Sequence, residues 1–365
     1  MLFEAGDLIA RPEREAARLK VTGSDDLTTG IAGAALWGPL LDRLGVVAEA
    51  DRRELRPIGP GGYTGGECYR AMVELIVAGG DVISDRSLLD GEANQRLRGQ
   101  HRLPSQWTLW RFGAETDFGR VAKAAAVNRR MLARAWALGA GPPGGLVTID
   151  PDATSVATYG LGKVGSTFSY KGQTGLSPLL GVCGETGDVL AVRARAGNAA
   201  PGRAMASFVR ECYFATPAPV RQDLNVWVRV DSAGHQLEVI DTCAELGAVF
   251  TITAPQRTTV RAAIETLATD ADTDWQPALG TEGTRGSEIA ETTFTIGAHT
   301  KTASRARTVR LIVRRQTTRG GDQLSFDDLD GWRFHAIITN LAAWIAPAVE
   351  VEHHHRRRGG IPEDA

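Results

Sequence analysis

Apolar residues recur at helical spacing through the first 140 residues of the chain. The pattern predicts a helix within residues 27–47 that ends at Gly45. A second helical pattern occupies residues 68–89 and is interrupted by Gly79 and Gly80. These segments predict a helical first third of the chain.

Two more helices are predicted before residue 140. Pro104 and Ser105 suit the start of a helix that carries Trp107, Trp110 and Arg111. This segment is either an interhelical turn with core tryptophans or a helix that reads DNA. Residues 118–141 form the last helical pattern, which bears a basic stripe of Arg120, Lys123, Arg129, Arg130 and Arg134.

The pattern changes to strands after a Gly- and Pro-rich boundary at residues 139–145. Residues 146–150 form one apolar run, and residues 176–195 form two alternating runs joined by a turn. Helix, strand, helix and strand then follow at residues 201–214, 225–233, 235–247 and 248–254. The order β, β, β, α, β, α, β favours a mixed sheet with flanking helices.

Residues 255–331 interrupt this order with a polar, threonine-rich and strand-like stretch, which predicts a β-rich inserted subdomain. Within it, Val309, Leu311 and Val313 alternate with arginines, as in a strand with one basic face. That face is either solvated or a phosphate-contacting surface. Residues 332–341 then resume a buried strand.

Composition excludes membrane-spanning and disulfide-stapled classes. The chain has 365 residues, 43% of them hydrophobic, enough for two or three packed units, and its formal net charge is −2. No apolar run could cross a bilayer and the first residues do not resemble a signal peptide, so we expect a cytoplasmic protein. The four cysteines lie far apart without a Cys-x-x-Cys pair, which argues against a zinc knuckle.

Three glycines mimic a dinucleotide-binding turn. Gly160, Gly162 and Gly165 have the G-x-G-x-x-G spacing, and Glu185 lies where a ribose-binding acid would be found. That turn requires a helix after the third glycine, whereas residues 166–178 are rich in β-branched residues and contain two glycines and a proline. We therefore predict a hairpin at this position.

Acidic residues follow two predicted strands of the core. Asp152 follows the first strand, with Asp150 beside it, and Asp231 ends a later strand, so their carboxylates could converge at neighbouring strand ends. Glu363 suits the first turn of a helix. Three converging carboxylates would repel one another without a cation, and their oxygens suit Mg²⁺ or Mn²⁺. A turn or cap role is the alternative for each aspartate.

Several segments together resemble bacterial insertion-sequence transposases of the DDE type, specifically family thirteen-eighty. They are "IDPDATSVATYG", "FSYKGQTGLSPLLGV", "TGDVLAVRARAGNA", "VRVDSAG" and "HHHRRRGGIPEDA", and "LPSQWTLWRF" in the helical first third fits as well. The resemblance implies an α/β, ribonuclease H-like mixed sheet with flanking helices. Residues 1–140 would be a helical DNA-binding region, residues 146–254 and 332–365 the two parts of the catalytic core, and residues 255–331 a β-rich insertion.

The resemblance also implies the chemistry. Asp152, Asp231 and Glu363 would be the catalytic triad and would hold Mg²⁺ or Mn²⁺, with Asp150 as a further candidate ligand. The partner would be DNA, both the terminal inverted repeats of the element and the target, bound by a homodimer that cuts the element ends and transfers the strands. The expected DNA-contacting residues are Arg111, Arg129, Arg130, Lys163, Lys171, Arg310, Arg314, Arg315, Arg356, Arg357 and Arg358.

The C-terminal end departs from the family pattern. Related transposases usually continue past the glutamate with a long helix bearing a lysine, whereas here the sequence stops two residues after Glu363. A helix cannot nucleate on three residues, so we expect a frayed glutamate and a truncated copy. His353–His355 are expected in a solvated or DNA-facing segment. The rival functions are an inactive, truncated DNA-binding fragment and a metal-dependent nuclease that cuts without joining.

Overall fold

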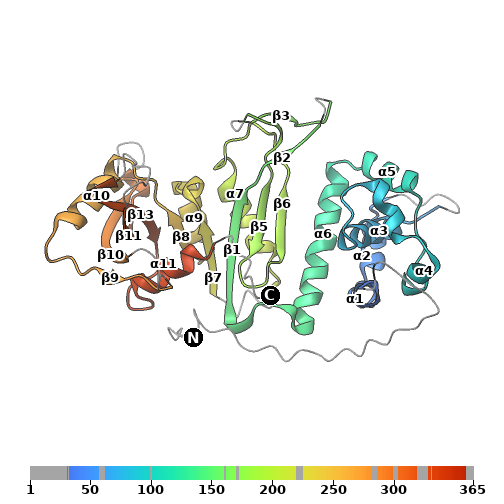
Figure 1. Ribbon diagram of the computed structural model, residues 1–365, viewed down its shortest axis with the longest axis horizontal. Coiled ribbons are helices and arrows are strands. Elements are labelled where there is room, and N and C mark those ends of the chain that lie inside the picture. The colour runs from blue at the N-terminus through green and yellow to red at the C-terminus, as the bar shows by residue number, and fades with distance from the viewer. Residues whose placement is uncertain are drawn as a thin grey trace. The chain divides into compact units, whose positions relative to one another are not determined.

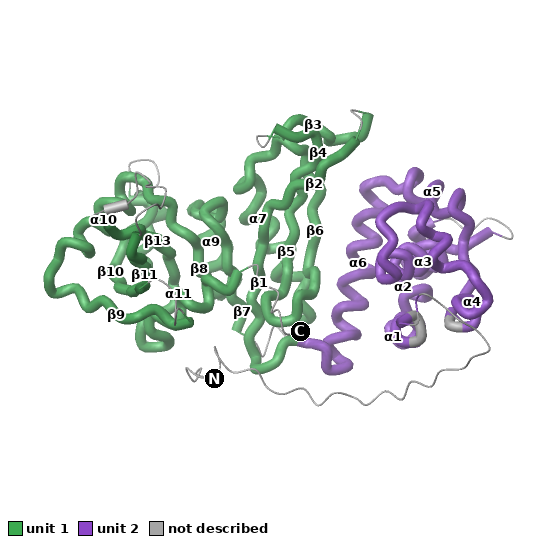
Figure 2. The backbone as a smooth tube through the Cα atoms, in the orientation of Figure 1, with its two compact units in different colours: residues 1–13, 142–365 green, residues 14–141 purple. Residues whose placement is uncertain are grey.

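The computed structural model describes residues 31, 33–56, 62–98, 101–159, 162–169, 172–218, 225–280, 286–298, 303–318, 328–329 and 331–358. The chain divides into two compact units (Figure 2), here called the helical unit, within residues 14–141, and the sheet unit, within residues 142–365. Across these described ranges no helix combines the length and the apolar character needed to cross a membrane.

The helical unit follows the predicted order of helices (Figure 1). Ser105 accepts a hydrogen bond from the Thr108 backbone N–H at 3.2 Å, which confirms the predicted helix start, and Gly45 adopts the left-handed conformation that ends the first helix. The elements are α1 (Ala34–Leu44), α2 (Val46–Arg52), α3 (Gly65–Val77), the 3₁₀ helix η2 (Ile83–Leu89), α4 (Glu92–Arg98), α5 (Gln106–Ala114), α6 (Phe118–Ala135) and the π-helical turn η3 (Trp136–Ala140).

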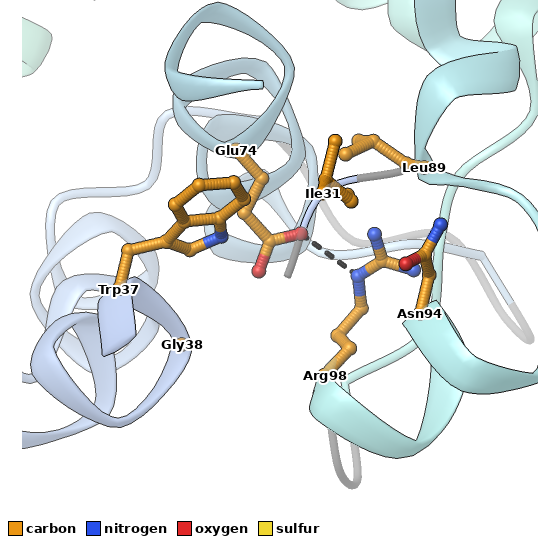
Figure 3. Close-up of a pocket in the computed structure, with 7 residues that line it drawn as sticks. All are labelled: Ile31, Trp37, Gly38, Glu74, Leu89, Asn94 and Arg98. Atoms are coloured by element: carbon orange, nitrogen blue, oxygen red, sulfur yellow. Dashed lines mark hydrogen bonds and ion pairs between the residues drawn. The ribbon is translucent and has the colours of Figure 1, made fainter. Parts of the chain in front are cut away.

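A buried charge network ties α1, α3 and α4 together. Glu74 accepts hydrogen bonds from Arg70 at 2.7 Å and from Arg98 at 2.8 Å, and all three side chains are buried. Figure 3 shows Glu74 and Arg98 beside a cavity of about 10 Å³, which has room for about one water molecule. Because the carboxylate satisfies both guanidinium groups, this network has a structural role.

Trp107 and Trp110 on α5 do not belong to the core of the helical unit. Their side chains are 62% and 50% exposed and stack on each other with ring centroids 4.8 Å apart. Leu109, on another face of α5, is the buried residue. Of the two readings of this segment, the one with core tryptophans is therefore wrong.

The sheet unit is built on a ten-stranded mixed sheet with flanking helices, as predicted. Its strand order among the described residues is β6-β5-β1-β7-β8-β13-β11-β10-β9, and β12 pairs with β13. The strands are β1 (Leu146–Ala153), β5 (Leu179–Cys183), β6 (Val189–Arg193), β7 (Asn225–Val230), β8 (Val249–Thr253), β9 (Gln276–Pro277), β10 (Ser287–Ile296), β11 (Arg307–Thr317), β12 (Asp328–Leu329) and β13 (Trp332–Thr339). The short helix η4 (Pro143–Gly145) precedes β1, and η5 (Ser232–Gly234) and η6 (Ala303–Arg305) lie between strands.

The centre of the sheet is parallel. β1 pairs in parallel with β7, and β7 with β8, while the other described pairs are antiparallel. The helix α9 (Leu237–Glu245) connects β7 to β8 in a β–α–β unit. Every residue of β7 except Asn225 is buried, as expected for a central strand covered on both faces.

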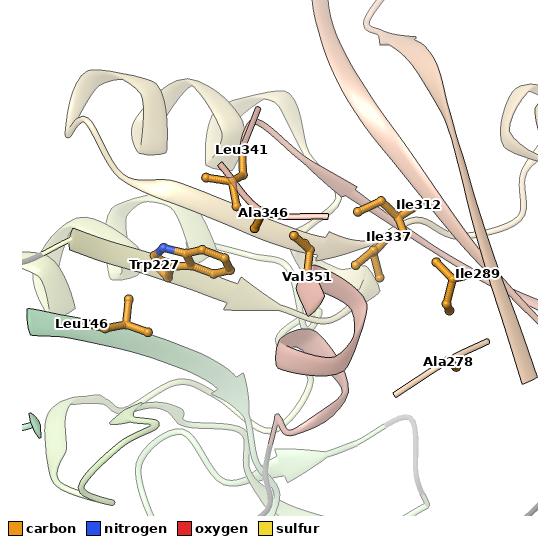
Figure 4. Packing of buried hydrophobic residues seen from close by; sticks show 9 residues of the cluster. All are labelled: Leu146, Trp227, Ala278, Ile289, Ile312, Ile337, Leu341, Ala346 and Val351. Carbon is orange, nitrogen blue, oxygen red and sulfur yellow. The ribbon is translucent and has the colours of Figure 1, made fainter. Parts of the chain in front are cut away.

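The two faces of the sheet are covered by different helices. α7 (Met205–Ala215) packs on β1, β5 and β6, and it approaches so closely that a Cβ on Gly181 would meet the Cys212 sulfur at 2.2 Å. α11 (Ala348–Arg356) packs on the other face, where Val351 joins a cluster with residues of β1, β7, β11 and β13 (Figure 4). The side chains that point away from α7 on β1 therefore point towards α11.

The described strands of residues 255–331, expected to form an inserted β-rich subdomain, are continuous with the main sheet. Strands β10 and β11 pair with each other and extend the main sheet through β13. Residues 258–269 form the helix α10 (Thr258–Thr269), although their threonine-rich pattern had been expected to be strand-like. Buried Val260 and Ile264, one helical turn apart, explain the helix, since tertiary packing overrides weak propensity.

Gly162 and Gly165 of the apparent dinucleotide motif lie between two strands of a small sheet, and Gly160 lies outside the described residues. β2 (Val156–Ala157), β4 (Thr174–Leu176) and β3 (Thr167–Phe168) form a small antiparallel sheet in that order. Among the residues described between β2 and β3 there is no helix, and Gly165 has a φ of 81°, a value suited to a tight turn. The prediction of a hairpin at this position is confirmed by the antiparallel pairing of β3 with β4.

Candidate active site

The candidate site lies where β1 and β7 end. The strands pair in parallel from Leu146 and Asn225 to Ile149 and Val228, a constant offset of 79 residues. Three residues past the last pair, the same offset places Asp152 level with Asp231. Neighbouring strands lie about 4.8 Å apart, and level residues of a parallel pair point to the same face. The ladder between β1 and β7 itself ends at Ile149 and Val228, and its register is the basis for expecting these two carboxylates at one strand edge.

Asp150 and Arg229 show that this register continues past the last pair. They are level by the same offset, and Arg229 donates from Nε to Asp150 Oδ1 at 2.7 Å and from Nη2 to Oδ2 at 2.5 Å. Arg229 Nη1 also donates to the His354 carbonyl at 2.5 Å. Both side chains thus lie on the α11 face, and side-chain alternation places the next level pair on that face as well.

The first metal-ligand candidate is exposed. The Asp152 side chain is 56% exposed, its Oδ1 accepts from the Ala153 backbone N–H at 2.8 Å, and Arg358 Nη2 lies 2.9 Å from the same oxygen. Asp231 accepts from the Ala233 backbone N–H at 2.9 Å, which starts a short helical turn. Both carboxylates keep oxygens that are available to a cation, which fits the donor set expected for Mg²⁺.

The remaining candidate ligands differ in their placement. Asp150 has both carboxylate oxygens bound to Arg229, and Glu363 lies outside the described residues. Within the described ranges no group of three His, Cys, Asp or Glu side chains is close enough to hold a metal ion. Asp152 and Asp231 are therefore the predicted ligands that lie within the described residues, and Glu363 is the third ligand that the sequence predicts.

Two of the three α11 histidines, His354 and His355, are buried and His353 is half-buried, which corrects the expectation of a solvated or DNA-facing segment. His354 Nε2 lies 3.1 Å from the Thr148 hydroxyl, and its ring meets that of Trp227 edge-on at 4.5 Å. His355 bridges two hydroxyls of β8, those of Thr251 and Thr253, at 3.0 Å each. The sheet supplies polar partners for these rings, so histidine serves as a core residue here.

Burial keeps both imidazoles neutral. Desolvation, with the nearby His335 and Arg229, lowers the pKa of His355 to about 3. Desolvation beside Arg229 lowers the pKa of His354 well below its usual value. Protonation would also leave His354 with a charged N–H at Nδ1, which has no hydrogen-bond partner among the described residues. The neutral forms therefore hold α11 on the sheet.

Acidification is expected to destabilise the sheet unit through these histidines. A folded-state pKa below the unfolded value means that the unfolded chain binds more protons, so stability is present above about pH 6.5 and is lost as the pH falls towards 3. His355 alone should contribute a loss of about 2 kcal/mol between pH 7 and pH 5. Urea unfolding at the two pH values measures this loss.

The variant His355→Gln is the control for that measurement. Glutamine can still bond a threonine hydroxyl but cannot be protonated, so His355→Gln should show a smaller loss of stability between the two pH values than the unmodified chain. His101→Gln, in the helical unit, should leave the loss unchanged. Equal losses in all three proteins would contradict the assignment.

The predicted DNA-contacting residues fall into two groups. Arg111, Arg130, Lys163 and Arg357 are exposed, Arg129 is half-buried, and Lys171 lies outside the described residues. The others make internal ion pairs: Arg310 with Glu291, Arg314 and Arg356 with Glu352, Arg315 with Glu288, and Arg358 with Asp152. Burial also lowers the pKa of Arg314, which lies under α11.

Sequence reasoning missed the role of Arg229. An arginine in the otherwise apolar run "VWVRV", two residues before Asp231, indicates a buried charge that needs a partner. That signal could have been read, because side-chain alternation places Arg229 on the same face as Asp231. The histidine–threonine contacts had no comparable signal in the sequence.

Similarity to known proteins identifies the family of this chain. A family model described as "Transposase DDE domain group 1" matches residues 69–363. The cryo-EM structure of the piggyBac transposase synaptic complex with hairpin DNA has 13% sequence identity and a TM-score of 0.39, covering 90% of this chain and 66% of that one. No curated protein matches. Because the family model covers most of the sequence, the chain belongs to the transposase DDE domain group 1 family.

Proposed function

We propose that this chain is a DNA transposase of the bacterial insertion-sequence type, with a ribonuclease H-like core. In this function it cuts DNA at the ends of its element and joins the freed 3′-hydroxyl groups to target DNA. The observation that supports the proposal is the parallel pairing of β1 with β7, whose 79-residue offset would bring Asp152 level with Asp231 at the strand ends. A turn or cap role alone would not require two carboxylates from remote segments to share one sheet edge.

Asp152, Asp231 and Glu363 would hold Mg²⁺ or Mn²⁺, with Asp150 fixed behind them by Arg229. Bound metal ions would lower the pKa of an attacking water or hydroxyl and stabilise the leaving oxygen. The reach of the chain supports Glu363 as the third ligand. Arg358 contacts Asp152, and five further residues span at most about 18 Å.

DNA contacts in this proposal come first from the exposed cations. Arg111, Arg130, Lys163 and Arg357 are accessible to phosphates, whereas most of the other candidates stabilise the fold through ion pairs. The helical unit would carry part of the DNA-binding surface, and two chains would form a homodimer on paired element ends. Phosphate contacts of this kind give affinity that falls with added salt.

The test is a cleavage and joining assay. The purified chain is incubated with a plasmid that carries its own coding region and flanking DNA, together with a second plasmid as target. With Mg²⁺ we expect double-strand ends and joined products, and with EDTA neither. Cleavage without joining would identify a nuclease, and DNA binding without cleavage would favour the inactive DNA-binding fragment.

A further inference from the structure

A groove on the helical unit, between α2 and α6, is lined by arginines. It has a volume of about 360 Å³, and its lining residues are Ala48, Glu49, Arg52, Arg53, Arg130 and Arg134. All of them belong to one compact unit, so the groove depends on no contact with the sheet unit. Its size is within the range of small-ligand sites, and its chemistry is that of an anion site.

Glu49 fixes the arginines of the groove. Its carboxylate is 4% exposed and accepts hydrogen bonds from Arg52 Nη2 at 2.6 Å and from Arg53 Nε at 2.7 Å. Arg134 Nη2 lies 4.0 Å from the second carboxylate oxygen, and Arg134 also donates to the Leu44 carbonyl. Three guanidinium groups are thus held around one buried anion in a defined geometry.

The groove keeps a large positive charge. Hydrogen bonds from Arg52 and Arg53 hold the pKa of Glu49 at about 2, so its carboxylate is charged at neutral pH. Four guanidinium groups against this single carboxylate leave a net charge of +3. Arg130 is exposed and makes no hydrogen bond or ion pair with the residues that the structure describes.

Preorganisation makes this charge specific for one kind of ligand. A guanidinium presents N–H groups in a planar fork that matches phosphate oxygens, and such charge-assisted bonds are stronger than neutral ones. Arg52 donates to Glu49 from Nε and Nη2, and Arg53 donates from Nε. Each guanidinium therefore has further N–H groups that do not contact Glu49. The remaining N–H groups and the unpaired Arg130 are available to a second anion.

We propose that this groove binds a phosphate group, and that its source is the phosphodiester backbone of DNA. The assignment of DNA as the source rests on the proposed transposase function, whereas the phosphate site itself does not. Arg130, which has no ion-pair partner among the described residues, acts as a cation of the site, and Arg52, Arg53 and Arg134 are positioned by Glu49. The groove gives the helical unit an anchor for DNA away from the acidic strand edge.

The experiment uses the full chain and two exposed arginines of the groove. Arg130→Ala removes the unpaired cation, and Arg52→Ala removes a side chain that is 63% exposed. Arg96→Ala is the matched control, because Arg96 is 66% exposed on a helix of the same unit and pairs with Glu92. Thermal unfolding first establishes that all variants fold like the unmodified chain.

Two probes then separate the possible sources of phosphate. Calorimetric titration with inorganic phosphate should show about tenfold weaker binding in Arg130→Ala than in Arg96→Ala. Fluorescence anisotropy with a duplex DNA, at several salt concentrations, should show weaker binding and a salt slope reduced by about 1.

Each outcome decides the proposal. Weakened binding of both probes in Arg130→Ala and Arg52→Ala supports a site for DNA phosphate. Weakened phosphate binding with unchanged DNA affinity would overturn DNA as the source and assign the groove to a free phosphate compound. Variants that bind both probes like Arg96→Ala would overturn the site. Retention of DNA cleavage in that last case would leave the transposase function standing, so the two failures are distinguishable.

Discussion

Replacement of Asp152 or Asp231 by asparagine is expected to abolish metal-dependent DNA cleavage while the fold remains stable. Asparagine keeps the size of the side chain and one oxygen but removes the negative charge that holds a divalent cation. The loss in rate should be about 10³-fold or more, which corresponds to about 4 kcal/mol of transition-state stabilisation. The cleavage rate on plasmid DNA with Mg²⁺ measures the effect.

The exposed Asp270, which follows α10, provides the control for this prediction. Asp270→Asn removes an exposed carboxylate at the end of α10, a helix that packs against β10. Because Asp270 is not one of the predicted metal ligands, DNA cleavage should continue at the rate of the unmodified chain. Cleavage by Asp152→Asn at the rate of Asp270→Asn would refute the assignment of the strand-edge pair. Asp150→Asn distinguishes Asp150 from Asp152 as the first metal ligand. Its main expected effect is a lower free energy of unfolding, whereas Asp152→Asn should lower the cleavage rate.

Loss of Arg229 should destabilise the sheet unit by about 3–5 kcal/mol, because it leaves the Asp150 carboxylate, whose side chain is 12% exposed, without its partner. Arg229 is 4% exposed, and it satisfies both oxygens of Asp150 as well as the His354 carbonyl. Denaturant unfolding of Arg229→Met, which keeps an apolar side chain of similar length, measures the change in the free energy of unfolding.

Two further variants identify the cause of that change. The double variant Arg229→Met/Asp150→Asn should be more stable than the sum of the single changes predicts, since it removes the unpaired charge. Arg210→Ala breaks an ion pair with Glu245 whose side chains are 42% and 61% exposed, and it should cost about 0–1 kcal/mol. Additive single changes would show that the pair is not coupled.

The local patterns that carried the correct predictions are those with short-range physical causes. Gly45 ends a helix through its own φ, and Ser105 starts one with its own hydroxyl. The strands that precede Asp152 and Asp231 are apolar because they are covered on both faces. These signals depend on a few neighbouring residues, so they can be read from the chain.

The arrangement of the site depends on contacts that no local pattern contains. The 79-residue offset between β1 and β7 is set by pairing across the sheet, so the sequence predicts that the acids converge but not that they are level. The segment "VEVEHHHRRR" has little apolar periodicity, so its histidines were expected in a solvated or DNA-facing segment. His354 and His355 instead contact threonine hydroxyls of distant strands. Arg314 was expected on an exposed or DNA-facing strand face for the same reason, and Glu352 of that helix is its partner.

The contact between Thr148 and His354 joins residues 206 positions apart. Contacts between residues so far apart in the chain form late in folding, because the intervening chain loses conformational entropy before the contact stabilises the fold. On the ribosome, β1, β7 and β8 are synthesised well before α11, so one face of the central sheet stays uncovered until α11 emerges. A nascent chain therefore exposes apolar residues such as Trp227 and Ile337 during this interval, which makes it a substrate for chaperones.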